Sequence, residues 1–318
     1  MRYMHLDGLA VPVSKIALGS TYLGSAYDKS LTYEFLDTFA AAGGTVIDTA
    51  RVYGEGASER VIGSWLAERG MRDKIVLVTK GLHNMSDGKS RYSAHNLAND
   101  IAQSQEALQS DAFDIWFLHR DDVRIPVEEI IDMVAPYVQS GTIRLLGASN
   151  WTPGRIEAAN RYAHSRHLPP IVASEIQWSL ARTDCDTWDD HGLVSMDDAS
   201  LMWYRKTRMP VFAYSAQSKG YFSKAIAHGI DALPQKCRTR FHTPENAMKI
   251  ERVRRLSDEL KLSVAAITIA FVTSAQPPAV AIVTGSTVAQ LQESLTGADV
   301  LLTAEQVTYL ETGVYGAT

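Results

Sequence analysis

Short apolar runs alternate with longer segments of helical periodicity along most of the chain. The runs are rich in β-branched residues, as buried strands are, and apolar residues recur every three or four positions in the segments between them. Strands are predicted over residues 16–18, 45–48, 75–79, 113–118, 143–148, 171–176, 211–214 and 280–283. Helices are predicted over residues 31–42, 58–68, 93–109, 127–139, 153–164 and 195–206.

Eight strands separated by helices indicate a parallel sheet with right-handed crossovers. This count favours a closed (β/α)8 TIM barrel, which needs about 250 residues, over an open doubly wound sheet. The turn at Asp7-Gly8 within an alternating stretch predicts an N-terminal β-hairpin. A long loop is predicted after strand seven and an extra C-terminal helix over 303–312. Because no linker interrupts the pattern, residues 1–318 are predicted to form a single domain.

Composition narrows the class of protein. The chain has 318 residues, 46% of them hydrophobic, and a formal net charge of -5 without a basic block, which argues against a nucleic-acid partner. The two cysteines, Cys185 and Cys237, lack the spacing of a metal site or a disulfide framework. No signal peptide and no apolar stretch as long as a membrane span is visible. We therefore expect a cytoplasmic protein without a membrane partner.

Polar or aromatic residues follow almost every predicted strand. In a barrel the residues just past the strands share one face, where active sites lie. Apolar packing does not account for such regularity, so a site is predicted at this face. The residues at these strand ends are Asp48, Lys80, His119, Ser149, Asn150, Gln177, Tyr214, Ser215, Gly285, Ser286 and Thr287.

Three of these residues, Asp48, Lys80 and His119, share a chemical logic with Tyr53 on the loop after Asp48. A phenol such as Tyr53, with an ordinary pKa of about 10, exchanges protons poorly near neutral pH unless a neighbouring ammonium lowers that pKa. Lys80 is suited to this, Asp48 to holding Lys80 charged, and a neutral His119 to orienting a carbonyl oxygen. The set suits a reaction in which hydride attacks a carbonyl carbon and the alkoxide is protonated.

Six motifs at matching strand ends resemble the aldo-keto reductase family, and the resemblance extends from the hairpin to about Leu295. They are Asp48-Thr49-Ala50-x-x-Tyr53-Gly54, Val78-Thr79-Lys80, Leu118-His119-Arg120, Gly147-Ala148-Ser149-Asn150, Glu175-Ile176-Gln177 and Tyr214-Ser215. The resemblance implies that Tyr53 is the proton donor, that Lys80 and Asp48 activate it, and that His119 orients the substrate.

The resemblance also implies a nicotinamide cofactor. Ser149, Asn150 and Gln177 match residues that hold the carboxamide, although Ser149 and Gln177 are also residue types that cap loops. Tyr214 matches the aromatic that stacks on the nicotinamide, and Ser215 follows it.

The segment after strand eight is predicted to bind phosphate at a helix N-terminus, with Glu293 receiving the adenine amino group. Its phosphate-binding residues are Gly285, Ser286, Thr287 and Gln290. One branch of the family has a Lys and an Arg where this chain has Thr284 and Gln290, whereas other branches carry small residues and Gln yet use NADP. NADP(H) is therefore favoured over NAD(H). Lys219 and Arg240 are either phosphate contacts or solvated cations.

Tyr22, Trp151 and Trp178 follow strands one, five and six and are candidates for the substrate wall, or else for packing under loops. The acidic segment 182–192 is expected to shape one side of the pocket, and no metal site is expected there. The last helix lies close to Thr318, so a short C-terminal loop and an open pocket for a polar carbonyl compound, such as a sugar, are predicted.

Three functions remain open. The first is an NAD(P)H-dependent reductase of aldehydes or ketones. The second is a nicotinamide-binding regulatory subunit that reports redox state with little turnover. The third is a barrel hydrolase with a metal on Asp48 and His119, which the adjacent charge of Lys80 opposes.

Overall fold

The computed structural model describes residues 1–84, 90–190 and 192–315. Its eight parallel strands form a closed barrel in the order β10-β3-β4-β5-β6-β7-β8-β9. This confirms the predicted (β/α)8 architecture. The chain forms two compact units, Tyr3–Glu175 and Met1–Arg2 with Ile176–Thr318, and these are described in turn.

The first unit opens with the predicted hairpin. Strand β1 (Tyr3–Met4) pairs antiparallel with β2 (Val13–Ser14). The turn between them includes Gly8, whose φ of 94° lies in the region that favours glycine. The alternating pattern and the Asp-Gly turn therefore predicted this element correctly.

Parallel strands with helices between them make up the rest of this unit. The strands are β3 (Ile16–Gly19), β4 (Val46–Asp48), β5 (Val76–Gly81), β6 (Phe113–Leu118), β7 (Ile143–Ser149) and β8 (Ile171–Gln177), whose last two residues belong to the second unit. Register sets Asp48 opposite Val78, Lys80 opposite Phe117 and Ser149 opposite Glu175. Polar strand ends thus lie side by side along one edge of the sheet.

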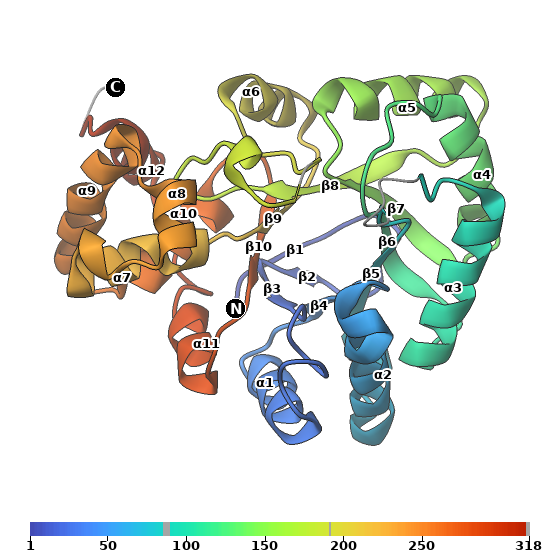
Figure 1. Cartoon of the computed structure of the whole chain (residues 1–318), viewed down its shortest axis with the longest axis horizontal. Coiled ribbons are helices and arrows are strands. Elements are labelled where there is room, and N and C mark those ends of the chain that lie inside the picture. The colour runs from blue at the N-terminus through green and yellow to red at the C-terminus, as the bar shows by residue number, and fades with distance from the viewer. Residues whose placement is uncertain (85–89, 191, 316–318) are drawn as a thin grey trace. The chain divides into compact units, whose positions relative to one another are not determined.

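Five helices cover the outer side of these strands (Figure 1). They are α1 (Lys29–Ala41), α2 (Ala57–Arg69), α3 (Ala94–Leu108), α4 (Val127–Gln139) and α5 (Pro153–Ser165). The side chains of Asp28, Ser93 and Thr152 accept hydrogen bonds from backbone N–H groups in the first turns of α1, α3 and α5. These caps explain where the helices begin.

The second unit contains the last strands and seven helices. Strand β9 (Val211–Tyr214) pairs parallel with β10 (Ala279–Val283). The helices are α6 (Asp198–Thr207), α7 (Tyr221–His228), α8 (Gln235–Phe241), α9 (Pro244–Leu260), α10 (Val264–Ser274), α11 (Val288–Leu295) and α12 (Ala304–Thr312). Helix α12 confirms the predicted C-terminal helix.

Two predictions for this unit were wrong. The expected long loop between β9 and β10 contains α7, α8, α9 and α10. Helix α10 is buried on every side, so its sequence lacks the polar face by which an amphipathic helix is recognised. Helix α6 begins at Asp198 rather than Ser195, because Ser195 bridges to Gln177 and the Asp197 side chain caps the helix.

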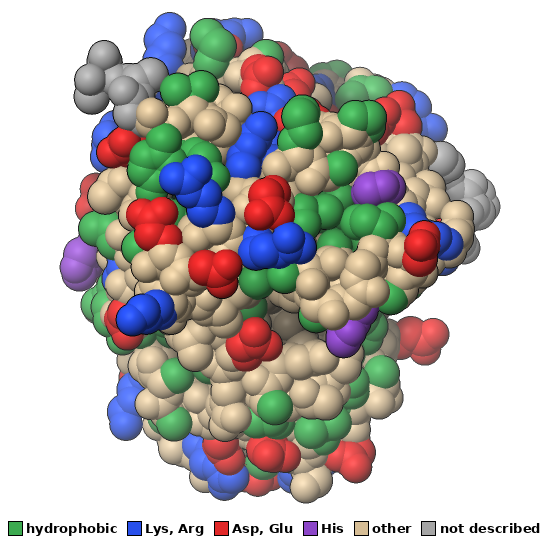
Figure 2. Space-filling model, turned by 90° about the vertical axis from the view of Figure 1, so that its left-hand side faces the viewer, with side chains coloured by type: hydrophobic (Ala, Val, Ile, Leu, Met, Phe, Trp, Pro, Cys, Tyr) green, Lys and Arg blue, Asp and Glu red, His purple; other side chains and the backbone are tan. Residues whose placement is uncertain are grey.

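Charged side chains of both signs are interspersed on the side of the second unit that carries α7, α9 and α12 (Figure 2). On α9, Arg254 lies 2.7 Å from Glu251. Such exposed pairs contribute little to stability. Across the described residues, every helix falls short of the length or the apolarity that a bilayer crossing requires.

The packing of α2 on α3 depends on Gly63, where an added Cβ would lie 2.3 Å from the Ala107 carbonyl oxygen. We expect Gly63→Ala to lower the free energy of unfolding by about 1–3 kcal/mol, because the backbones must move apart. Chemical denaturation measures this. Gly154→Ala in α5 is the matched control, because no described atom lies within 4 Å of its added Cβ; it should be neutral or stabilise by up to about 1 kcal/mol. Equal effects of the two substitutions would contradict the packing argument.

Candidate active site

Asp48, Tyr53, Lys80 and His119 all lie in the first unit, at or just past neighbouring strand ends. Asp48 is the last residue of β4, Lys80 lies near the end of β5, and His119 follows β6 directly. All three are buried. Tyr53 is half-buried and begins η1 (Tyr53–Gly56), a short helical turn after β4. The fold therefore brings the four residues together as predicted.

The Lys80 ammonium lies between two carboxyl groups. Its Nζ donates to Asp48 Oδ1 at 2.5 Å and to the Thr49 carbonyl at 3.0 Å, and it lies 3.3 Å from Glu175 Oε1. Burial alone would lower the pKa of Lys80, but the charges of Asp48 and Glu175 outweigh it and the pKa is raised. Lys80 is therefore a fixed positive charge.

The Tyr53 ring faces both Lys80 and His119. Lys80 Nζ lies 5.3 Å from the ring centroid, and the rings of Tyr53 and His119 are 5.9 Å apart with an interplanar angle of 81°. Burial raises the pKa of Tyr53, and the opposing effect of Lys80 is smaller. Lys80 does lower the pKa of Tyr53, as expected, but the prediction that this pKa is lowered overall was wrong, because burial raises it by more.

His119 is held in its neutral form. Burial is the main reason that its pKa lies well below the ordinary value, and the charge of Arg120 and the neighbouring His83 add to the effect. The rings of His83 and His119 are 4.6 Å apart, at 80°. His119 Nδ1 has no hydrogen-bond partner within the described part of the chain. A neutral imidazole with an unused nitrogen suits the predicted contact with a carbonyl oxygen.

Two residues next to these four were missed as site residues. His83 follows β5 by two residues and packs edge-on against His119. Glu175 appeared in a sequence motif without a role, yet its carboxyl group contacts Lys80. A signal was available for Glu175, because an acid inside a buried strand needs a partner.

The other predicted residues of the first unit differ in exposure. Asn150 is buried, and its Nδ2 donates to Ser149 Oγ at 3.0 Å. Trp151 is fully buried, with Nε1 donating to the Arg120 carbonyl at 3.2 Å, which favours packing under a loop over a place in the substrate wall. Tyr22 is 44% exposed and is available to a ligand.

The predicted residues near β8 and β9 belong to the second unit. Gln177 Nε2 donates to Ser179 Oγ at 3.1 Å. Trp178 is buried and its backbone N–H donates to the Tyr214 carbonyl at 3.4 Å, which also favours packing under a loop. Tyr214 is half-buried, and Ser215 has a φ of 52°, which sharply turns the chain after β9.

The segment before α11 combines exposed hydroxyl groups with a capped helix start. Thr287 Oγ1 accepts from the backbone N–H of Gln290 at 3.3 Å, and Gln290 Oε1 accepts from the N–H of Ser286 at 2.7 Å. Ser286, Thr287 and Glu293 are exposed. The buried Thr284 hydroxyl has no hydrogen-bond partner among the described residues. Hydroxyl groups at a helix N-terminus are compatible with a phosphate.

The two candidate phosphate-binding cations differ. Lys219 is exposed in the turn after β9. Arg240 already has partners, because its Nη2 lies 3.3 Å from Asp189 Oδ2 and its guanidinium lies 4.4 Å from the Trp188 ring centroid. Asp189, in the acidic segment 182–192, also pairs with Lys236 at 2.7 Å. His191 of the same segment lies outside the described residues.

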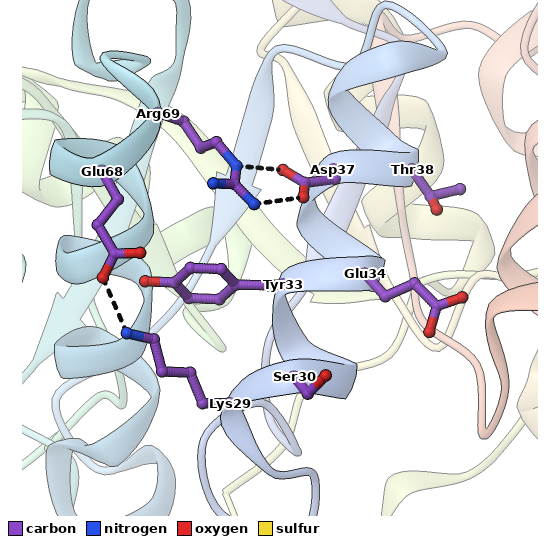
Figure 3. Close-up of a pocket in the computed structure, with 8 residues that line it drawn as sticks. All are labelled: Lys29, Ser30, Tyr33, Glu34, Asp37, Thr38, Glu68 and Arg69. Carbon is purple, nitrogen blue, oxygen red and sulfur yellow. Dashed lines mark hydrogen bonds and ion pairs between the residues drawn. The ribbon is translucent and has the colours of Figure 1, made fainter.

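A surface pocket between α1 and α2 is lined by paired charges (Figure 3). Lys29 lies 2.8 Å from Glu68, and Arg69 lies 2.9 Å from Asp37. These side chains are largely exposed and satisfy one another. The pocket therefore offers less to a ligand than the strand-end residues do.

Comparison with known proteins agrees with the barrel fold. The sequence pattern of the aldo/keto reductase family matches residues 15–313. The chain therefore belongs to the aldo/keto reductase family and is an NAD(P)-dependent oxidoreductase.

Similar proteins are known from fungi and bacteria. An aldo-keto reductase of Emericella nidulans is 28% identical over 335 residues, which cover 98% of this chain and 81% of that protein. An NADP(+) aryl-alcohol dehydrogenase of Phanerodontia chrysosporium is 30% identical over 56% of this chain and 51% of its own length. An aldo/keto reductase of Klebsiella pneumoniae, solved with NADP and acetate, has a TM-score of 0.70 at 24% identity and covers 94% of this chain and 91% of its own. That structure supports the fold.

The burial of His119 leads to a prediction about its charge. At a pH of about 6, below the ordinary histidine pKa of about 6.5, its ring should remain neutral in nitrogen-detected NMR spectra. The NMR signal of the His119 ring is identified as the one that is lost in His119→Gln. By linkage, the stability from a neutral His119 is present above pH 6.5 or so and is lost as the pH falls towards the folded-state pKa. A ring that protonates near its ordinary pKa would contradict the geometry.

Proposed function

We propose that this protein reduces an aldehyde or ketone to the alcohol, with hydride from NADPH and a proton from the Tyr53 hydroxyl. The observation that carries the proposal is the convergence of Lys80 and a neutral His119 on the Tyr53 ring. An acid, a cation that stabilises its phenolate and an orienting donor at one strand-end edge suit proton transfer to a carbonyl oxygen.

A bound nicotinamide supplies the hydride that adds to the carbonyl carbon. His119 donates a hydrogen bond to the carbonyl oxygen and orients it. As the oxygen becomes an alkoxide, the Tyr53 O–H bond breaks and its proton moves to that oxygen. The phenolate left on Tyr53 is stabilised by the Lys80 ammonium, which Asp48 holds in place at 2.5 Å.

For the cofactor, we assign the carboxamide contacts to Ser149 and Asn150 in the first unit and to Gln177 in the second. In the second unit, Tyr214 and Ser215 are assigned to the nicotinamide end. The exposed hydroxyls near the start of α11 support an assignment to phosphate, with Glu293 for adenine. These phosphate-binding residues are Gly285, Ser286, Thr287 and Gln290.

For the substrate, we propose an aromatic aldehyde or ketone, because a relative is an aryl-alcohol dehydrogenase. Exposed Tyr22 supports this, since aromatic faces stack on aromatic ligands. The alternative is the sugar-like carbonyl compound expected from the sequence. Trp151 and Trp178 are buried and are assigned to packing under loops. The cytoplasmic location remains a prediction.

The proposal is tested by NADPH oxidation with a panel of aromatic and sugar aldehydes. Turnover is expected, and fastest with an aromatic aldehyde. NADPH binding without turnover on any member of the panel would instead favour the regulatory subunit.

We expect Tyr53→Phe to lower kcat for aldehyde reduction by about 10²–10⁴-fold, because the general acid is removed. NADPH affinity, measured by fluorescence titration, should change little. Tyr162→Phe is the matched control, since the Tyr162 hydroxyl bonds Asp132 on the helical surface at 2.8 Å. Retained turnover in Tyr53→Phe would sink the assignment.

The hydroxyls before α11 lead to a cofactor prediction. NADPH should bind at least about tenfold more tightly than NADH, a difference of about 1.4 kcal/mol. Ser286→Ala should weaken the binding of NADPH more than that of NADH, because only NADPH carries the additional phosphate. Titration of both cofactors measures this, with NADH as the internal control; equal affinities would contradict the preference.

A further inference from the structure

The carboxyl group of Glu175 is buried within β8. Only 3% of the residue is exposed, and it lies opposite Ser149 in the register of β7 and β8. A buried carboxyl group must be either neutral or closely paired, because desolvation penalises its charge. Glu175 therefore needs either a bound proton or a close partner for its carboxyl group.

Glu175 is paired only in part. Its Oε1 lies 3.3 Å from Lys80 Nζ, whereas Oε2 is buried and has no hydrogen-bond partner in the described ranges. Asp48 already contacts the same ammonium at 2.5 Å. Two buried carboxyl groups thus share one ammonium, whose single positive charge compensates only one of them.

Burial raises the pKa of both carboxyl groups, and the shorter contact of Asp48 with Lys80 Nζ, 2.5 Å against 3.3 Å for Glu175, indicates that Glu175 is the one that keeps the proton. Burial and the negative charge of Asp48 raise the pKa of Glu175 to about 8, against the opposing effects of Lys80 and Arg120. When Glu175 is neutral, the negative charge of Asp48 and the positive charge of Lys80 cancel. When Glu175 ionises, the group acquires a net negative charge.

The net charge of Lys80, Asp48 and Glu175 acts on the pKa of Tyr53. The charged groups that act on it are Lys80, which favours its phenolate, and Asp48 and Glu175, which oppose it. The neutral His119 ring is its other neighbour. A second carboxylate therefore makes Tyr53 a weaker acid.

We propose that Glu175 is a positioning residue for the Tyr53 proton transfer: its bound proton keeps Lys80 available to the phenolate, and its loss weakens Tyr53 as an acid. This inference rests on the proposed function and goes beyond it by adding a second, titratable carboxyl group. Aldehyde reduction should therefore slow as the pH rises through the ionisation of Glu175.

The test compares the pH profiles of kcat/KM and kcat for the unaltered enzyme, Glu175→Gln and Glu175→Asp. The unaltered enzyme should lose about three- to tenfold in kcat/KM across this ionisation. Glu175→Gln keeps the shape of the side chain but cannot ionise, so its profile should lose this falling limb, the decrease in kcat/KM at high pH. Glu175→Asp should retain the limb at a shifted pH. A limb that persists unchanged in Glu175→Gln overturns the proposal.

Glu59→Gln is the matched control, because Glu59 is equally buried but contacts Thr79 at 2.7 Å and Arg51 at 3.2 Å. Its profile should keep the limb. If Glu175→Gln does not fold, Glu175→Asp decides, since an unshifted limb in that variant overturns the proposal.

A second measurement does not need turnover. Ultraviolet titration, with Tyr53→Phe subtracted, follows the Tyr53 phenol, which should ionise at lower pH in Glu175→Gln than in the unaltered protein. An unchanged titration overturns the proposal. If no carbonyl compound is reduced, the proposed function fails, and the phenol titration still decides the role of Glu175.

Discussion

The buried contact between the Lys80 ammonium and the carboxyl groups of Asp48 and Glu175 is the interaction on which the site depends. Each partner reaches it from a different strand, and each is removed from water. Deleting one partner of a buried ion pair costs about 3–5 kcal/mol, because the other charge is left without compensation. The group therefore constrains the relative positions of β4, β5 and β8 as well as the chemistry of Tyr53.

The electrostatic consequences of this contact extend to the aromatic side chains. Lys80 stays charged because two carboxyl groups outweigh its burial, whereas His119 stays neutral because burial and nearby positive charge act in the same direction. A fixed cation and a neutral imidazole thus both lie next to the Tyr53 ring. Such a preorganised pair can stabilise a phenolate and orient a carbonyl group without first reorganising.

The positions of most strands and helices could be predicted from the sequence, because β-branched runs and helical periodicity are local signals. Helix α10 was missed because it is buried all round and has no polar stripe. Trp151 was expected at the mouth of the barrel, yet its indole N–H donates to the Arg120 carbonyl from a buried position. Aromatic residues near a strand end have the same sequence signal whether they face solvent or pack inward.

By itself, the sequence determined the order of strands and helices, the acid at the end of β4 and the identity of Tyr53, Lys80 and His119. Only the tertiary structure decided how their charges balance. It placed Glu175 against Lys80 and made burial outweigh Lys80 in setting the pKa of Tyr53. The physical reason is that pKa shifts depend on desolvation and on distances between residues far apart in the chain, which residue order does not specify.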